Sequence, residues 1–284
     1  TGIIIFSISI FSILNDGIKN RFPLHIKMYK KNEIDNEILR KKSWTFLSNK
    51  IKVEFKSSDD TIKFSPQFSS SENLKKVLFV GDSHSKDLFN IFFQNKNLFP
   101  EFEFARYGIR IKNFGNRDYD DIFLKSSNFI NSDIVIIGTA WWHDDLDKIK
   151  ILHDYCSKNN KILIITSKPP EFKTYTRDPL FDFYLKNLIK QKKTEYSRDS
   201  LNSLFYQNLI FNNFVTFNEK LKKISQDLNI LYLDAYDFIC NDSKKQCEGV
   251  TPDGYKVFYD QIHYTLEGAK YLGKKIYEQK WFRI

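Results

Sequence analysis

Hydrophobic residues from position 76 onward fall into short continuous runs separated by amphipathic stretches. Four runs predict buried strands, at residues 77–80 (VLFV), 133–138 (DIVIIG), 161–167 (KILIITS) and 230–234 (ILYLD), and residues 102–107 form a weaker fifth. Helical periodicity lies between the strands, over residues 86–93, 146–157, 180–193 and 201–228. Apolar strands that alternate with helices indicate an α/β fold, in which a parallel sheet is covered on both faces.

The last predicted helix begins near Thr265, whose side chain can cap it. Ala269, Leu272 and Ile276 share one face of this helix and would pack on the sheet. In such a fold the carboxyl ends of the strands meet at one edge, so we expect the binding site there.

The first 75 residues do not follow this pattern. Residues 3–14 (IIIFSISIFSIL) are almost wholly apolar, yet a bilayer span needs about 20 residues. We interpret residues 1–14 as the end of a truncated transmembrane helix, with a buried core strand or helix as the alternative. Residues 15–75 predict an extension or linker segment, in which residues 31–50 could form an amphipathic helix.

The amino-acid composition is typical of a globular protein, and the chain carries a net positive charge. Apolar residues make up 42% of the 284 positions and charged residues 28%, and the formal net charge is +9. A basic surface can bind nucleic acid, an anionic membrane or an acidic polysaccharide. Because the lysines are scattered and no nucleic-acid motif is present, we expect no nucleic-acid partner and interpret most of the charge as solvated surface.

The chain contains three cysteines. Cys240 and Cys247 flank a polar loop (NDSKKQ), a spacing that suits a small disulfide loop in an oxidising compartment, with two free thiols as the alternative. Cys156 lies on a helical apolar stripe and is expected to be a buried thiol.

Two short segments could carry chemistry. The strand at residues 77–80 ends in Gly81-Asp82-Ser83-His84, which places Ser83 at a strand-to-helix turn. The hydroxyl would then project above the sheet edge, close to the N–H groups of the helix start, as acyl transfer requires. An ordinary capping serine is the alternative for this segment taken alone.

The second segment, Asp260-x-x-His263, comes just before the last helix. We expect this spacing to put both side chains on one side of a helical turn, so that Asp260 fixes the imidazole and His263 activates the serine. Alone, such a pair is more often a surface turn.

Together, these segments resemble the first and last blocks of the SGNH hydrolase superfamily. The Gly-Asp-Ser-His form resembles SGNH domains fused to membrane-bound acyltransferase-3 proteins, which also carry a short disulfide loop before the last block. The resemblance implies a three-layer α/β/α sandwich over residues 76–284, with Ser83 as nucleophile, Asp260 as acid and His263 as base. It also implies a transmembrane helix and an extension ahead of the domain.

The family stabilises the oxyanion with the serine N–H, a second-block glycine and a third-block asparagine. Gly108 and Gly115 are both candidates for the glycine. The third block should follow the strand at residues 133–138, where Ala140 stands in place of the asparagine. An indole N–H of Trp141 or Trp142 could replace the missing donor.

Trp141 and Trp142 could also stack on a sugar of the acceptor, or simply pack in the core or at the rim. The neighbouring segment His143-Asp144-Asp145 contains possible metal ligands, but acids near a histidine are common at helix starts, and we expect no metal.

By resemblance, we expect the extracytoplasmic domain of an inner-membrane O-acyltransferase that acylates hydroxyls of a surface polysaccharide such as lipopolysaccharide. We expect no cofactor in this domain, because the membrane part would use the acyl donor, acetyl-CoA. Two alternatives remain: a carbohydrate esterase with the same triad, and a non-catalytic glycan-binding domain that retains the motifs.

Overall fold

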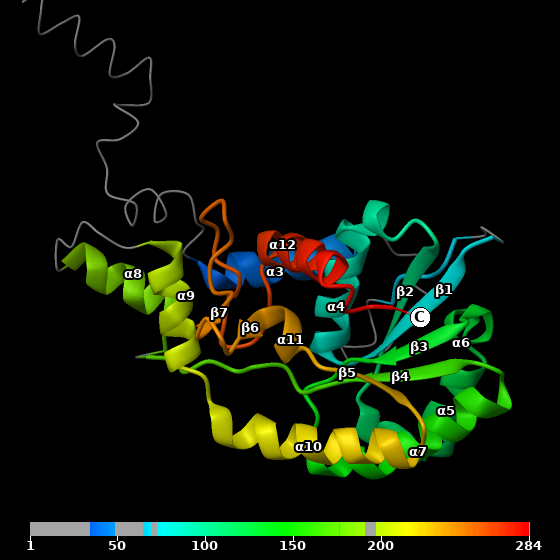
Figure 1. Ribbon diagram of the computed structural model, residues 1–284. Helices are drawn as coiled ribbons and strands as arrows, with labels where there is room; N and C mark the ends of the chain where they lie inside the picture. The colour runs from blue at the N-terminus through cyan, green and yellow to red at the C-terminus, as the bar shows by residue number, and fades with distance from the viewer. Residues whose placement is uncertain (1–34, 49–64, 70–72, 176, 191–196, 284) are drawn as a thin grey trace, which may run out of the picture.

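The computed structural model describes residues 35–48, 65–69, 73–175, 177–190 and 197–283. Its centre is a five-stranded parallel sheet with the order β2-β1-β3-β4-β5 (Figure 1). The strands are β1 (Lys75–Gly81), β2 (Phe102–Gly108), β3 (Ile134–Ile137), β4 (Ile162–Thr166) and β5 (Leu231–Leu233). All of the strands expected from the apolar runs are present, and the α/β prediction is confirmed.

Helices cover both faces of the sheet (Figure 1). One layer contains α3 (Asn36–Ser48), α4 (Ser83–Gln94), α8 (Leu180–Lys190), α9 (Arg198–Gln207), α11 (Tyr236–Ile239) and α12 (Leu266–Glu278). The other contains α5 (Arg117–Leu124), α6 (Ser127–Asn131), α7 (His143–Lys158) and α10 (Phe211–Asp227). Short 3-10 turns lie at η1 (Lys96–Leu98) and η2 (Ile111–Asn113).

The two faces of β1 belong to different cores, because successive side chains of a strand point to opposite sides. Val77 and Phe79 pack with α4 and α12, whereas Leu78 and Val80 pack with α7 and α10. Each of these four side chains is fully buried. The continuous apolar run of this strand is therefore the direct result of its having a helical layer on each side.

Residues 201–228 do not form the single helix expected from their periodicity. They form α9 and α10, separated at residues 208–210. Leu209 there forms an isolated bridge with Phe172, and the Ile210 N–H donates to the Glu171 carbonyl. The Asn208 carbonyl also accepts a hydrogen bond from the Lys173 N–H. A distant segment therefore binds the backbone at this break, a competition that helical periodicity does not reveal.

The last block of the chain follows the sequence prediction closely. α12 begins after Thr265, whose hydroxyl accepts a hydrogen bond from the Gly268 N–H at 2.9 Å. Ahead of it, β6 (Cys240–Asn241) and β7 (Gln246–Cys247) form a small hairpin. A disulfide joins Cys240 to Cys247 across this hairpin, as predicted, and Cys156 is a buried free thiol.

The preceding segment contributes a helix to the same body. α3 packs beside α4, where the Asn90 amide donates to the Ser43 carbonyl at 3.1 Å. The predicted membrane-helix end at residues 1–14 lies outside the described residues. In the part of the chain that the structure describes, no helix combines the length and apolar character needed to cross a membrane.

Candidate active site

Ser83 is the first residue of α4, at the carboxyl end of β1. Asp82 caps this helix, because its carboxylate accepts a hydrogen bond from the His84 N–H at 3.0 Å. The turn needs a glycine: Gly81 has φ of +144°, and an added Cβ would lie 2.0 Å from the Gly138 carbonyl oxygen. The close contact of β1 with the end of β3 thus places the serine at the sheet edge.

His263 and Asp260 lie in a loop, and not on the helical turn expected from their spacing. The loop is closed by a bridge between Phe258 and Tyr264 and by a bond from the Tyr259 N–H to the His263 carbonyl. Asp260 Oδ1 accepts hydrogen bonds from the backbone N–H groups two and three residues later, at 2.9 and 2.7 Å. This side-chain-to-backbone turn brings the two side chains together without a helix.

The three predicted residues form one hydrogen-bonded chain. Asp260 Oδ2 lies 2.8 Å from His263 Nδ1, and His263 Nε2 lies 2.8 Å from Ser83 Oγ. Both ring nitrogens of His263 are therefore engaged. The arrangement can hold the imidazole in one tautomer and pass the serine proton to it.

The electrostatics of the site favour a basic imidazole. Burial would lower the pKa of His263, but the hydrogen bond to Asp260 and the charges of Asp87 and Asp260 together raise it above its usual value of 6.5. Burial would likewise raise the pKa of Asp260, yet its bonds to His263 hold it below its usual value. Asp260 is therefore ionised at neutral pH and can stabilise an imidazolium.

Asp82 also holds the loop that follows β3. Its Oδ2 accepts hydrogen bonds from the Thr139 hydroxyl at 3.0 Å and from the Ala140 N–H at 3.1 Å. Ala140 is the residue that replaces the third-block asparagine. Its position is fixed through its backbone, and that N–H is already bonded to a carboxylate.

Neither candidate glycine offers an oxyanion donor in this structure. The Gly108 N–H donates to the Ser65 hydroxyl at 3.1 Å, and the Gly115 N–H donates to the Asp120 carboxylate at 3.1 Å. Both expectations are therefore wrong for this arrangement of the loops. The Ser83 N–H is the remaining backbone donor of the expected oxyanion site. It lies in the first turn of α4, and in the described part of the chain it donates to no other group.

One of the two tryptophans is buried and the other is exposed. Trp141 adopts φ of +47°, is fully buried, and its indole N–H donates to the Thr166 carbonyl at 2.8 Å. It is a core residue, so its assignment to the oxyanion or acceptor site is wrong. Trp142 is 67% exposed, and the Lys168 ammonium lies 5.5 Å from its ring centroid.

Ser83 opens into a cavity of about 530 Å³. The lining comes from the turns after β1 and β3 and from the segment after β2: Asp82, Ser83, Arg110, Ile111, Lys112, Thr139, Ala140, Trp142, Asp144 and Asp145. Trp142 thus lines the same cavity as the serine. Sequence reasoning did not identify Arg110 and Lys112, because exposed basic residues are common over the whole chain.

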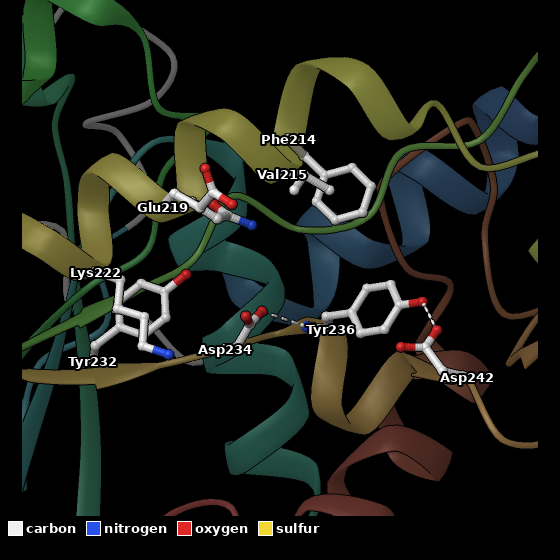
Figure 2. Close-up of a pocket in the computed structure, with 9 residues that line it drawn as sticks. Phe214, Val215, Glu219, Lys222, Tyr232, Asp234, Tyr236 and Asp242 are labelled. Carbon is white, nitrogen blue, oxygen red and sulfur yellow. Dashed lines mark hydrogen bonds between the residues drawn. The ribbon is translucent and has the colours of Figure 1, made fainter.

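A second cavity, of about 280 Å³, lies between α10 and the segment that runs from β5 to the turn after β6 (Figure 2). Aromatic rings and acids line it, and two of its carboxylates are bonded within the protein. Asp242 accepts from the Tyr236 hydroxyl at 2.5 Å, and Asp234 accepts from the Tyr236 N–H at 2.9 Å. None of the three residues of the Ser83 chain lines it, so we assign the chemistry to the larger cavity.

Two clusters contain side chains that could bind a metal. His84, Asp87 and His263 offer ligand atoms within 4.8 Å of one another, but both nitrogens of His263 already serve Asp260 and Ser83. In the His143-Asp144-Asp145 segment, Asp145 accepts a hydrogen bond from the Trp142 N–H at 2.7 Å and so caps α7. We assign a metal to neither cluster.

Buried charges beneath the serine were not foreseen from the sequence. The Lys86 ammonium is fully buried, pairs with Asp87 at 2.5 Å and donates to the Ser43 hydroxyl of α3 at 3.0 Å. The fully buried Arg106 of β2 donates to the Ser85 hydroxyl at 2.8 Å and to the Asp82 carbonyl at 2.9 Å. Burial lowers the pKa of Arg106 to about 10, which leaves it charged at neutral pH. In the sequence, Lys86 and Arg106 resemble the charged residues of any exposed helix or strand face, so their burial could not be predicted.

The five-stranded parallel sheet with helices on both faces has the fold of an SGNH hydrolase. The sequence profile of the SGNH domain fused to AT3 domains matches residues 54–278. The chain belongs to this family.

One of the similar solved structures has the same fold by its TM-score. The periplasmic domain of the Salmonella ser. Paratyphi A lipopolysaccharide acetyltransferase aligns with a TM-score of 0.51 at 18% identity, over 74% of this chain and 85% of that one. The acetyl xylan esterase AlAXEase aligns at 14% identity over 72% and 98% of the two chains, with a TM-score of 0.42. A GDSL-like lipase from Bacteroides thetaiotaomicron aligns at 14% identity over 73% and 87%, with a TM-score of 0.38. No curated protein sequence matches the chain.

Proposed function

We propose that this domain transfers an acyl group, most simply acetyl, to a hydroxyl of a surface polysaccharide, through a triad of Ser83, His263 and Asp260. The observation that carries the proposal is the hydrogen-bonded chain from Asp260 through His263 to Ser83 at a cavity. Membership of a family fused to AT3 domains supports transfer in preference to hydrolysis. It also supports an extracytoplasmic place beside a membrane acyltransferase part. For that membrane part we propose acetyl-CoA as the acyl donor.

The chemistry has two steps. In the first, Ser83 Oγ attacks the acyl carbonyl while His263 Nε2 takes the hydroxyl proton, and the donor's leaving group departs with that proton. In the second, a sugar hydroxyl attacks the acyl-enzyme, His263 takes its proton, and the proton returns to Ser83 as the ester forms. Asp260 stabilises the imidazolium in both steps.

Trp142 is the acceptor contact in this proposal. It lines the Ser83 cavity and presents a largely exposed indole, which can pack on the apolar face of a pyranose. A sugar held there is close to the acyl carbon, and this proximity lets its hydroxyl compete with water.

The oxyanion donors bear on the choice between transferase and esterase. Gly108, Gly115 and Ala140 all donate their N–H groups to other acceptors. Each missing oxyanion donor typically costs about 2.7–4 kcal/mol of transition-state stabilisation. The isolated domain is therefore expected to hydrolyse small esters slowly, as suits a transferase that relies on its acceptor.

The first test compares Ser83→Ala with wild type in hydrolysis of p-nitrophenyl acetate and in labelling by a serine-reactive phosphonate. We expect both to be lost in the variant. Ser157→Ala, on the exposed part of α7, is the matched control and should behave as wild type. Labelling that persists in Ser83→Ala would show that another residue is the nucleophile. A wild-type domain that reacts with neither reagent would favour the glycan-binding alternative.

A further inference from the structure

Two aromatic rings stack on the imidazole of His263. The His84 ring lies 4.9 Å away between centroids, with 16° between the planes. The Tyr259 ring lies 5.7 Å away, with 7° between the planes. Three nearly parallel rings from two separate segments therefore stand beside the serine. Neither flanking ring belongs to the triad.

Both flanking rings are fixed in place. His84 is in the first turn of α4, is 6% exposed, and its N–H is held by Asp82. Tyr259 is 3% exposed, and its hydroxyl accepts a hydrogen bond from the Lys86 ammonium at 3.3 Å. Its backbone N–H also donates to the His263 carbonyl at 3.0 Å. Rings held this firmly can restrict the motion of a neighbour.

Such restriction matters most after the first chemical step. Once Ser83 carries the acyl group, it has no hydroxyl proton to donate, and its bond to His263 Nε2 is lost. The imidazole then retains the single hydrogen bond to Asp260, about which it can tilt. A tilted ring would miss the incoming sugar hydroxyl, and a misplacement of about 1 Å can cost on the order of 10²-fold in rate.

The charge state of His84 fits this arrangement. Burial is the largest influence and lowers its pKa to about 4, with His263 and Lys86 acting in the same direction and Asp82 and Asp87 opposing. His84 is thus neutral at pH 7. A neutral ring can stack on an imidazolium without placing two like charges side by side.

We propose that His84 and Tyr259 are positioning residues that hold the His263 ring facing Ser83 through the second, acyl-transferring step. The inference rests on the proposed function, since it assigns a role within that reaction. It predicts that a flat ring at each position is required, whereas the imidazole nitrogens of His84 and the hydroxyl of Tyr259 are not.

The test uses two pairs of variants, His84→Phe with His84→Leu and Tyr259→Phe with Tyr259→Leu. Each pair compares a flat ring with an apolar side chain that cannot stack. Thermal unfolding first establishes that a variant is folded. Steady-state and burst-phase hydrolysis of p-nitrophenyl acetate then give kcat, KM and the fraction of acylated enzyme.

We expect the Phe variants to stay within about threefold of wild-type kcat. The Leu variants should lose on the order of 10²-fold in kcat and should accumulate acyl-enzyme. KM should fall in parallel, because a slower second step leaves kcat/KM unchanged. If Leu matches wild type, or if Phe is as impaired as Leu, the inference is overturned. If one Leu variant does not fold, the other pair decides. Ser83→Ala is measured beside these variants. If Ser83→Ala keeps its activity, the proposed function has failed; if it loses activity while the Leu variants do not, only the positioning role is wrong.

Discussion

Replacing Asp82 with alanine should destabilise the protein more than the loss of a helix cap alone. Its carboxylate accepts hydrogen bonds from the His84 N–H, the Thr139 hydroxyl and the Ala140 N–H, at 3.0, 3.0 and 3.1 Å. Loss of the cap costs about 0.5–2 kcal/mol. A buried polar group left without a partner costs about 1–3 kcal/mol more, and Thr139 is only 2% exposed. We therefore expect Asp82→Ala to lower the free energy of unfolding by about 2–4 kcal/mol.

Urea denaturation followed by tryptophan fluorescence measures this change. Asn116→Ala is the matched control, because Asn116 caps α5 through a single bond to the Asp118 N–H at 3.1 Å and makes no such loop contacts in the described structure. It should lose only the cap contribution, about 1 kcal/mol. Asp82→Asn retains one acceptor oxygen and should fall between the two. Equal losses in Asp82→Ala and Asn116→Ala would refute the claim that Asp82 secures the loop after β3.

The remaining predictions concern pH, the tryptophans and the disulfide. His263 must be neutral to accept a proton, and its pKa is raised above 6.5. The kcat/KM for p-nitrophenyl acetate should therefore fall as the pH drops through a value above 6.5, and should be retained at higher pH. A midpoint well below 6.5 would contradict this. Trp141→Ala should cost about 3–5 kcal/mol of stability as a buried core truncation, whereas Trp142→Ala should unfold within about 0.5 kcal/mol of wild type yet reduce O-acylation of the glycan in cells. Similar unfolding free energies for the two variants would be the contrary result. Reduction of the Cys240–Cys247 bond should lower the unfolding free energy by about 2–3 kcal/mol, and mass spectrometry without reductant should detect the linked peptides; an unlinked pair in protein from an oxidising compartment would count against it.

Local patterns were sufficient to predict the sheet and the placement of the serine. The strands β1, β3 and β4 carry buried side chains on both faces, so their apolar runs are continuous and could be recognised without knowledge of distant residues. Gly81 and Ser83 are predictable for a similar reason, since the turn and the helix start are set within a few positions. Asp260 and His263 were predicted as a pair, although the turn that joins them is a loop.

Residues whose role depends on distant partners were not predictable. Trp141 and Trp142 are adjacent and chemically identical, yet a left-handed φ at the first turns it into the core and leaves the second at the cavity. Gly108 and Gly115 were equal candidates because their competing acceptors, Ser65 and Asp120, are identified only by the fold. The single helix expected over residues 201–228 failed for the same reason, because a distant segment binds the backbone at the break.

The helix α3 has a consequence for where this folding unit begins. The family profile starts at residue 54, so it leaves α3 out. Yet Ser43 accepts a hydrogen bond from the buried Lys86 ammonium, and the Trp44 ring lies 5.3 Å from that ammonium. A recombinant fragment cut at the profile boundary would expose a cation beneath the nucleophile and remove two of its partners. We therefore expect the smallest autonomous unit to be longer than its sequence signature, because the helix ahead of the signature contacts the buried cation next to the active site.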